Sequence, residues 1–369
     1  MGVDDLSKTI TKDNYMDKYK TKMTIKKWFS LINLNNLSGK AKKAIQHFDA
    51  YTKKLTFRRA LKLFLYAIND ETNSLRHLEK QLVNPKLKKA IDLDEISYSQ
   101  LSRAIQALDS SVLMEIFYQL LSLVHQQTEG KTNEKVYLID STTFSFSQPS
   151  YPWAKFRKTK SGVKLHLSVC FMEDGFIHPV QFEISNAVEH DNDYLDVFVT
   201  KTDAIYIFDR GYLDFDRFDQ MSEDGYYFVT RLKKDTVTQV IKEFKVQEDS
   251  DIISDQLVTL GNERESNTPY RVLTVQRKGR PDLRLVTNKL TLPAEDIGKM
   301  YKSRWQIELF FKHIKQHMTI KTYFSKSEDG VINQLILAMI VYLLTLLIKL
   351  ELALKQTIFQ ILRIFRAVQ

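Results

Sequence analysis

The sequence predicts a mixed α/β protein whose strand-rich middle section lies between two helical sections. Three observations carry this prediction. Residues 24–128 place apolar side chains at helical spacing and contain one glycine, Gly39. From Lys135 the apolar runs become short and strand-like, with helical segments between them, and from Leu335 the apolar pattern is helical again. We therefore expect a mixed sheet in the middle of the chain, with helices packed on both of its faces.

Length and composition limit the class of protein. A chain of 369 residues suits two or three domains rather than one small core. A formal charge of +9 favours polyanionic partners, a bias that ribosomal and membrane-surface proteins share. The single cysteine, Cys170, excludes an internal disulfide and a cysteine zinc cluster, and its apolar surroundings predict a buried, unreactive thiol. The N-terminus lacks the apolar core of a signal peptide, so we predict a cytoplasmic protein.

The N-terminal section, residues 1–130, is predicted to be an all-helical DNA-binding domain. Its basic side chains are dense and are listed here: Lys40, Lys42, Lys43, Lys53, Lys54, Arg58, Arg59 and Lys62. Such density indicates a surface that contacts phosphates, although a solvated helical face also carries basic residues. Residues 94–105 look like a cap and a short polar helix, compatible with a recognition helix or with a plain surface helix.

Residues 131–230 are predicted to alternate strands and helices around two acids. The expected elements are strands at 136–140, 163–171 and 176–184, a helix at 194–200, a strand at 204–209, a helix at 215–221 and a strand at 226–230. Residues 173–175 read as a hairpin turn. The first apolar strand ends at Asp140 and the later one at Asp209. Together with a distant acid-bearing helix, this is the element order of a ribonuclease H-like domain.

Residues 231–290 are predicted to form a β-rich insertion. Asp209 and Glu308 are separated by 98 residues, which is more than one helical connection needs. Four short strands are expected in this interval, at 236–246, 256–260, 270–277 and 283–287.

Residues 301–315 are predicted to form one amphipathic helix. Its charged stripe, at steps of three and four residues, consists of Tyr301, Arg304, Glu308, Lys312 and Lys315. The opposite face consists of Ile307, Phe310, Phe311 and Ile314. A salt-bridge ladder facing solvent is one interpretation of the stripe. The rings of Tyr301 and Trp305 favour a binding face instead, because a solvated face does not need large aromatic side chains.

The C-terminal section, residues 329–369, is predicted to be helical. Its apolar run at 335–348 is fourteen residues long and therefore shorter than a membrane span, so we expect a packed helix and no membrane. Residues 355–366 form an amphipathic pattern that either covers the catalytic domain or pairs with a second subunit.

The spacing Tyr-x2-Arg-x3-Glu-x6-Lys, given by Tyr301, Arg304, Glu308 and Lys315, resembles the signature of the DDE class of insertion-sequence transposases, in the group named after insertion sequence four. The resemblance covers about 135–325 and implies a ribonuclease H-like catalytic domain in two parts, 131–230 and 291–328, with the insertion between them. It also implies that Asp140, Asp209 and Glu308 are the metal-binding catalytic acids.

Carboxylates from separate elements suit the chemistry of phosphodiester cleavage. Two Mg²⁺ ions, with Mn²⁺ as a substitute, need oxygen ligands and can activate the attacking oxygen and stabilise the leaving oxygen. If the strands that end at Asp140 and Asp209 are neighbours, both side chains emerge at one sheet edge, and Glu308 arrives from a helix. A single strand-end aspartate is more often a turn or cap residue. The prediction therefore depends on the three acids together.

The resemblance also implies DNA contacts around these acids. Tyr301, Arg304, Lys312 and Lys315 would contact phosphates. Trp305 would stack on a displaced base, with a core tryptophan as the alternative. Arg210 would contact DNA or anchor its turn. We treat three histidines as structural, because they lack ligand spacing: His166, His178 and His190.

The predicted function is that of a prokaryotic cut-and-paste transposase in the nucleoid-associated cytoplasm. Its partners would be the double-stranded inverted-repeat ends of its element and target DNA, held by a homodimer. The alternatives are a ribonuclease H-like nuclease or resolvase that does not join strands, and a domesticated DNA-binding relative. The cut-and-paste reaction is compatible with a hairpin intermediate and with a route that lacks one.

Overall fold

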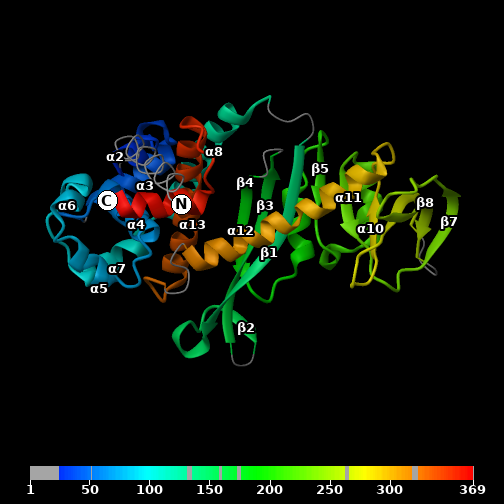
Figure 1. Cartoon of the computed structure of the whole chain (residues 1–369). Helices are drawn as coiled ribbons and strands as arrows, with labels where there is room; N and C mark the ends of the chain where they lie inside the picture. Colours follow the sequence, from blue (N-terminus) through cyan, green and yellow to red (C-terminus); the bar gives the residue numbers. More distant parts are fainter. Residues whose placement is uncertain are drawn as a thin grey trace, which may run out of the picture. The chain divides into compact units, whose positions relative to one another are not determined.

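One set of helices and one extended sheet make up the computed structural model, which describes residues 25–50, 52–130, 135–157, 160–172, 176–261, 266–317 and 323–368. The chain divides into two units (Figure 1). Gly130–Phe311 forms the sheet unit, and the helical unit combines the described residues before it with those from Lys312 onward. The predicted hairpin turn at 173–175 lies outside the described residues.

The described elements from Ile25 to Thr128 are all helical, as predicted for the N-terminal section. The elements of the helical unit are α2 (Ile25–Ser30), η1 (Leu34–Asn36), α3 (Gly39–Ala50), α4 (Phe57–Asn69), α5 (Leu75–Gln81), α6 (Pro85–Ile91), α7 (Tyr98–Ala107), α8 (Ser110–Thr128), α13 (Glu328–Glu351) and α14 (Ile358–Val368). Side-chain caps from Thr56, Ser97 and Asp109 begin α4, α7 and α8. The seven-residue helix α6 has only Leu87 and Ile91 as buried residues.

Helix α13 is the core of the helical unit. It packs against α4, α7, α8 and α14, and Asn333 donates from Nδ2 to the carbonyl oxygens of Ile105 and Leu108 at 2.9 and 2.8 Å. The helix is 24 residues long and therefore long enough to span a membrane, whereas the apolar run in the sequence has only fourteen residues. Taken singly, it is the one described helix long and apolar enough to cross a membrane, and 94% of its apolar window is buried. Burial identifies it as a core helix.

Helix α14 packs on the N-terminal helices. Its predicted apolar face, Ile358, Ile361, Leu362 and Phe365, is buried. The ring of Phe365 stacks on Trp28 at 5.5 Å between centroids, and Arg366 Nη1 lies 2.6 Å from Glu71 Oε1. The apolar face therefore covers helices of its own unit, whereas the sequence predicted the catalytic domain or a second subunit.

The sheet unit contains a mixed sheet, as predicted. Its strands are β1 (Lys135–Ser147), β2 (Lys155–Arg157), β3 (Lys160–Phe171), β4 (Ile177–Asn186), β5 (Ala204–Ile207), β6 (Tyr227–Arg231), β7 (Thr238–Glu243), β8 (Ile252–Leu260), β9 (Tyr270–Val275) and β10 (Leu283–Thr287). Over the described residues the order is β2-β3-β1-β5-β6-β10-β9-β8-β7, with β4 paired to β3. The pairs β1–β5 and β5–β6 are parallel. Strand β10 pairs with β6, so the β-rich segment continues the same sheet.

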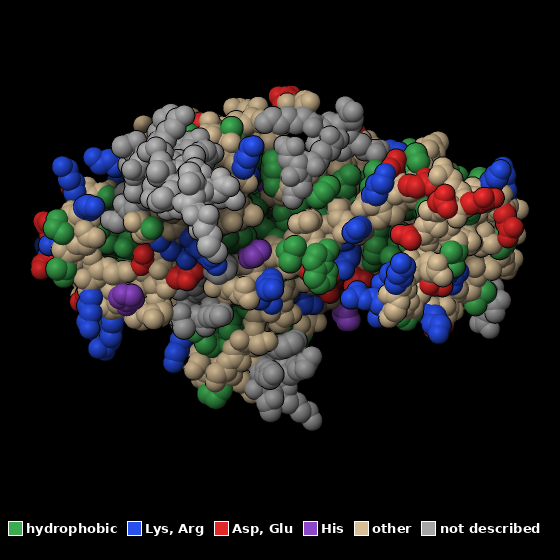
Figure 2. Space-filling view, viewed as in Figure 1, with side chains coloured by type: hydrophobic (Ala, Val, Ile, Leu, Met, Phe, Trp, Pro, Cys, Tyr) green, Lys and Arg blue, Asp and Glu red, His purple; other side chains and the backbone are tan. Residues whose placement is uncertain are grey.

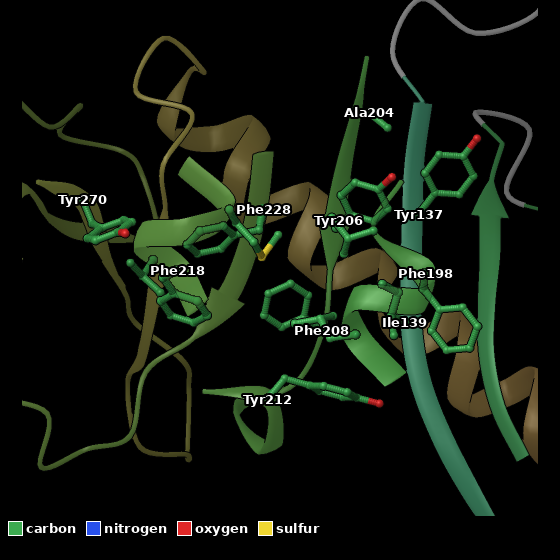
Figure 3. Packing of buried hydrophobic residues seen from close by; sticks show 14 of the residues in the cluster. Tyr137, Ile139, Phe198, Ala204, Tyr206, Phe208, Tyr212, Phe218, Phe228 and Tyr270 are labelled. Carbon is green, nitrogen blue, oxygen red and sulfur yellow. The ribbon is translucent and has the colours of Figure 1, made fainter. Parts of the chain in front are cut away.

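Among the described residues, seven helical elements connect or cover the strands of the sheet unit. They are η2 (Gln148–Ser150), η3 (Asp191–Tyr194), α9 (Leu195–Phe198), η4 (Arg210–Tyr212), α10 (Phe215–Glu223), α11 (Ala294–Ser303) and the start of α12 (Trp305–His317). Tyr137 and Ile139 of β1 point into an aromatic core with Tyr206 and Phe208 (Figure 3). Because side chains alternate along a strand, Asp140 points to the opposite face from Ile139.

Arg271 on β9 links the β-rich strands to the segment that leads into α11. Its Nε and Nη2 donate to the two carboxylate oxygens of Asp255 on β8 at 2.9 and 2.7 Å. Its Nη1 donates to the carbonyl oxygen of Leu290 at 3.0 Å. Arg271 and Asp255 are both buried, so the pair depends on its two partners remaining together.

Replacing Arg271 with Ala should destabilise the protein, because the carboxylate of Asp255 would stay buried without a partner. We expect the free energy of unfolding to fall by roughly 3–5 kcal/mol, measured by urea denaturation of the full chain. The control is Lys299→Ala, which breaks an exposed pair with Asp296 and should cost less than about 1 kcal/mol. Equal losses in the two variants would contradict the prediction.

Candidate active site

Strands β1 and β5 bring the first two acids to one level of the sheet. They pair in parallel, and the last pair in register is Leu138 with Ile207. Asp140 and Asp209 each follow two residues later, and the predicted neighbouring strands are therefore confirmed. One detail was wrong: Asp140 lies within β1 rather than at its end. Strand β1 continues to Ser147 against β3 after β5 has stopped, which leaves one side of β1 open at Asp140.

The carboxylate of Asp140 is held by the backbone and affected by two other acids. The N–H of Ser141 donates to Asp140 Oδ1 at 2.8 Å. The pKa of Asp140 is raised to about 6: burial is the main cause and the charges of Asp209 and Glu308 add to it, whereas the Ser141 N–H and Arg304 oppose the rise. The other two predicted acids are therefore close enough to affect Asp140 electrostatically.

Asp209 begins the tight turn η4 directly after β5. Its Oδ1 accepts a hydrogen bond from the N–H of Arg210 at 2.5 Å, while the side chain of Arg210 is exposed. Tyr212, at the end of the turn, packs on Phe208 with 5.8 Å between ring centroids. Its hydroxyl points toward β1 in Figure 3. Burial raises the pKa of Tyr212, and the charges of Asp191, Asp140 and Asp209 add to the effect.

Glu308 lies at the start of a second helix rather than in the middle of one. The predicted helix over 301–315 is divided into α11 and α12, and Arg304 stands between them. Tight turns of the i to i+3 kind cause the break: the N–H of Arg304 donates to Tyr301 O at 3.1 Å, and that of Ile307 donates to Arg304 O at 3.2 Å. The predicted apolar face is nevertheless buried, at Ile307, Phe310, Phe311 and Ile314.

Arg304 joins the acids across the break. Its Nη2 donates to Glu308 Oε1, its Nη1 lies 3.6 Å from Asp140 Oδ2, and its guanidinium carbon lies 5.9 Å from the centre of the Tyr301 ring. Burial lowers the pKa of Arg304, but Glu308, Tyr301 and Asp209 outweigh it, so the pKa is raised. Tyr301, Arg304 and Glu308 thus share one face despite the break, and Asp140 joins them from β1.

The donor set fits a hard divalent cation, although the side chains are not arranged around one. Within the residues that the structure describes, no three His, Cys, Asp or Glu side chains are placed to hold a metal ion. Arg304 supplies the positive charge between Asp140 and Glu308. Oxygen-only carboxylate donors are the ligands that Mg²⁺ and Mn²⁺ prefer. Binding of such an ion between Asp140 and Glu308 would require the guanidinium of Arg304 to move away from the two carboxylates.

The other predicted residues differ in their exposure. Trp305 is 57% exposed, so the alternative of a core tryptophan was wrong. Lys312 is exposed, and Lys315 is half-buried with a pKa that burial lowers. Sequence reasoning missed Lys299 and Lys302, which are exposed on α11; Figure 2 shows basic side chains over this helix.

The buried titratable groups predicted to be structural are not part of the acid cluster. His166 is fully buried and burial lowers its pKa to about 4, so it is neutral at pH 7. His178 is also buried. Burial raises the pKa of Cys170 to about 11, which agrees with the predicted unreactive thiol. His190 precedes η3 without capping it through its side chain.

The basic set of the helical unit is partly used inside the unit. Lys54 pairs with Glu95 and Arg59 pairs with Asp92, each at 2.6 Å. The remaining exposed members are Lys40, Lys42, Lys43, Lys53 and Arg58. Helix α7 begins with a capping box between Ser97 and Gln100, and its exposed side chains include Ser99, Gln100 and Arg103. A polar exposed helix face is therefore present where the sequence predicted one.

Sequence reasoning also missed a polar network next to Asp140, formed by Ser141, Asp191 and Lys164. Ser141 Oγ donates to Asp191 Oδ1 at 2.6 Å, and Lys164 Nζ lies 3.2 Å from the same oxygen. The signal available in the sequence was weak: a serine directly after the first acid, and an aspartate in a polar turn fifty residues later.

Comparison with known proteins gives one family. The family model described as a transposase DDE domain matches residues 131–344, more than half of the chain. A protein of Geobacillus stearothermophilus named as a probable transposase for insertion sequence element IS5377 is 26% identical over 298 residues, 79% of this chain and 76% of that protein. A protein of Sinorhizobium fredii named as a candidate transposase, y4zB, is 32% identical over 240 residues, 63% of this chain and 66% of its own length. A protein of a Synechocystis species named as a candidate transposase for insertion sequence element IS4SA is 27% identical over 267 residues, 68% and 71% of the two chains.

Replacing Arg304 with Ala should make the stability of the protein depend on divalent cations. Without the guanidinium, the repulsion among Asp140, Asp209 and Glu308 is not offset. We expect the Tm of the variant to fall below that of the wild type in EDTA and to rise more than the wild-type Tm when Mn²⁺ is added. The control is Lys302→Ala on the exposed side of α11. A Tm response to Mn²⁺ equal to the wild-type response would contradict the prediction.

Proposed function

Because the chain belongs to the DDE class of insertion-sequence transposases and is a DNA transposase, we propose that it cuts the inverted-repeat ends of its own element and joins them to target DNA. The observation that carries the proposal is the convergence of Asp140 and Glu308 on Arg304, with Asp209 at the same level of the sheet as Asp140. We assign Asp140, Asp209 and Glu308 as the catalytic carboxylates.

A ribonuclease H-like catalytic core is the fold that we propose for the sheet unit. The antiparallel pairs β1–β3 and β3–β4, followed by the parallel strands β5 and β6, support it. We keep the predicted layout as part of this proposal: a helical DNA-binding domain at 1–130, the core at 131–230 and 291–328, the β-rich insertion at 231–290 and C-terminal helices at 329–369.

The class uses divalent metal, and we propose that this chain binds two Mg²⁺ ions, or Mn²⁺ in their place, through Asp140, Asp209 and Glu308. Bound metal of this kind supplies Lewis acidity at the attacking and leaving oxygens of a phosphodiester. The protein's own part is to present oxygen ligands from β1, η4 and α12 and to keep Asp140 oriented through the Ser141 N–H.

Side chains of η4, α11 and α12 and of the residue between the two helices would hold the DNA. We assign phosphate contacts to Tyr301, Arg304, Lys312, Lys315 and Arg210, because a guanidinium or ammonium beside a scissile bond fixes the backbone without reading its sequence. Trp305 is exposed one residue from Arg304. We assign it to stacking on a displaced base in a reaction that passes through a DNA hairpin.

DNA is the partner of a transposase, and the helical unit offers a second place to bind it. We propose that the exposed basic residues of α3 and α4, together with the polar face of α7, contact the inverted repeat. Two ends must be cut in concert, so we propose that the protein is a homodimer in the DNA complex. We also propose that it is a prokaryotic cytoplasmic protein that associates with the nucleoid.

Isosteric replacement of any one acid should abolish cleavage. For Asp140→Asn, Asp209→Asn and Glu308→Gln, we expect nicking of duplexes that carry the element's terminal repeats to fall at least about a thousandfold, which is about 4 kcal/mol of barrier. Binding to the same duplexes should persist, because the phosphate-contacting residues remain. Retained nicking in Mg²⁺ by any of the three variants would contradict the assignment.

Strand joining with precut ends separates a transposase reaction from that of a nuclease or resolvase. Wild-type protein should insert a precut end into target DNA, and the three acid variants should not. Cleavage without joining would favour the nuclease alternative. Binding without either reaction would favour a domesticated DNA-binding protein.

Replacing Trp305 with Ala should lower the ratio of hairpin product to nicked product. Stacking of one base on an aromatic ring is worth about 1–3 kcal/mol, so we expect a roughly 5- to 150-fold fall in the ratio, measured by gel analysis of end-labelled duplexes. Trp305→Phe keeps a ring and should retain most of the ratio. An unchanged ratio in the Ala variant would remove Trp305 from the hairpin step.

A further inference from the structure

The orientation of the Asp140 carboxylate depends on a hydrogen bond from Ser141, and the side chain of Ser141 is in turn hydrogen-bonded to Asp191. The N–H of Ser141 donates to Asp140 Oδ1 at 2.8 Å. Its hydroxyl, on the opposite face of β1, donates to Asp191 Oδ1 at 2.6 Å. A continuous path of two hydrogen bonds therefore runs from Asp191 on η3 to the first acid.

Asp191 is fixed by strand β3 rather than by its own turn. Lys164 Nζ lies 3.2 Å from Asp191 Oδ1 and donates to the carbonyl oxygen of Glu189 at 2.6 Å. His166 Nδ1 lies 3.5 Å from the same Asp191 oxygen. The ring of His166 stacks on Tyr194 at 3.7 Å between centroids and its Nε2 bonds Ser185 at 2.9 Å. These contacts hold Asp191 in the position where it accepts the hydrogen bond from Ser141 of β1.

The hydrogen bond between Ser141 and Asp191 lies where β1 no longer pairs with β5. Strand β5 stops pairing with β1 at Leu138, so the edge of β1 that faced β5 is open at Asp140, and β3 holds the backbone there only from the opposite edge. Tyr212 follows β5 and is buried, and a side-chain hydrogen bond with Ser141 opposes the rise of its pKa. A side-chain hydrogen bond to Ser141 at this point restricts the strand that carries the first ligand.

We propose that Asp191 is a positioning residue for the catalytic carboxylate of Asp140 and acts through Ser141. The proposal rests on the proposed function, because it assigns Asp140 to metal binding. Asp191 does not touch the reacting atoms. It orients a ligand in the way that outer partners orient ligands at metal sites, where their loss typically costs about 10- to 100-fold in metal affinity or activity.

The test is the affinity of the full chain for Mn²⁺ alone, measured from the free-ion signal in electron paramagnetic resonance. Asp191→Ala and Ser141→Ala should each weaken Mn²⁺ binding about 10- to 100-fold. Asp191→Asn keeps an acceptor for Ser141 and should lose less. The matched control is Asp193→Asn, an exposed acid in the same turn, which should bind Mn²⁺ within about twofold of the wild type.

The double variant Asp191→Ala, Ser141→Ala separates positioning from general damage. Because the two residues act in one path, its loss of Mn²⁺ affinity should be no larger than that of either single variant. A fall in Tm without a change in Mn²⁺ affinity would make Asp191 merely structural and overturn the proposal. If Asp191→Ala does not fold, Ser141→Ala, which removes one hydroxyl, decides the question by the same criterion.

The outcome for Asp140→Asn distinguishes this proposal from the proposed function. If Asp140→Asn loses Mn²⁺ affinity and Asp191→Ala retains it, the further inference fails and the function stands. If Asp140→Asn binds Mn²⁺ and cleaves like the wild type, the assignment of the acids fails, and with it both proposals.

Discussion

Repulsion among three carboxylates is the constraint on which the site depends. Burial disfavours the charge of Asp140, and the charges of Asp209 and Glu308 disfavour it further. Arg304 offsets this cost by contacting Asp140 and Glu308 together. A charge pair of this kind is stable only while both members remain in place, because either one alone would be a partly buried, uncompensated charge. The site is therefore organised around the guanidinium as much as around the acids.

The scaffold creates the site through a difference in strand length. Strand β5 ends at Ile207, whereas β1 continues to Ser147 along β3. Two parallel strands of equal length would have surrounded Asp140 with backbone on both sides. The early end of β5 leaves room for the η4 turn, which presents Asp209, and for the junction of α11 with α12, which presents Arg304 and Glu308. The aromatic core around Phe208 keeps β5 and the turn in position from the other face.

Local pattern was enough to predict the elements that present the acids. Apolar runs predicted β1 and β5, and the apolar face at Ile307 and Phe310 was correct because side-chain periodicity survives a tight turn. The break at Arg304 was not predictable, since neither Gly nor Pro marks it. The length of α13 was underestimated because its first turn, capped by Ser327, contains Glu328 and Asp329 and does not look apolar. Asp191 was missed for a different reason: its partners Ser141 and Lys164 are distant in sequence, and only the register of β1 with β3 brings them together.

If the proposed function is correct, the position of Arg304 links the two things that the site must bind. A guanidinium suits phosphate as well as carboxylate, because its planar fork matches both geometries. On that proposal, a DNA phosphate that attracted Arg304 would remove the positive charge from between Asp140 and Glu308, and the acids would then favour a cation more strongly. By the same coupling, a cation on the acids would free Arg304 for phosphate. The physical cost of assembling three carboxylates would thus favour binding of DNA and metal together rather than separately.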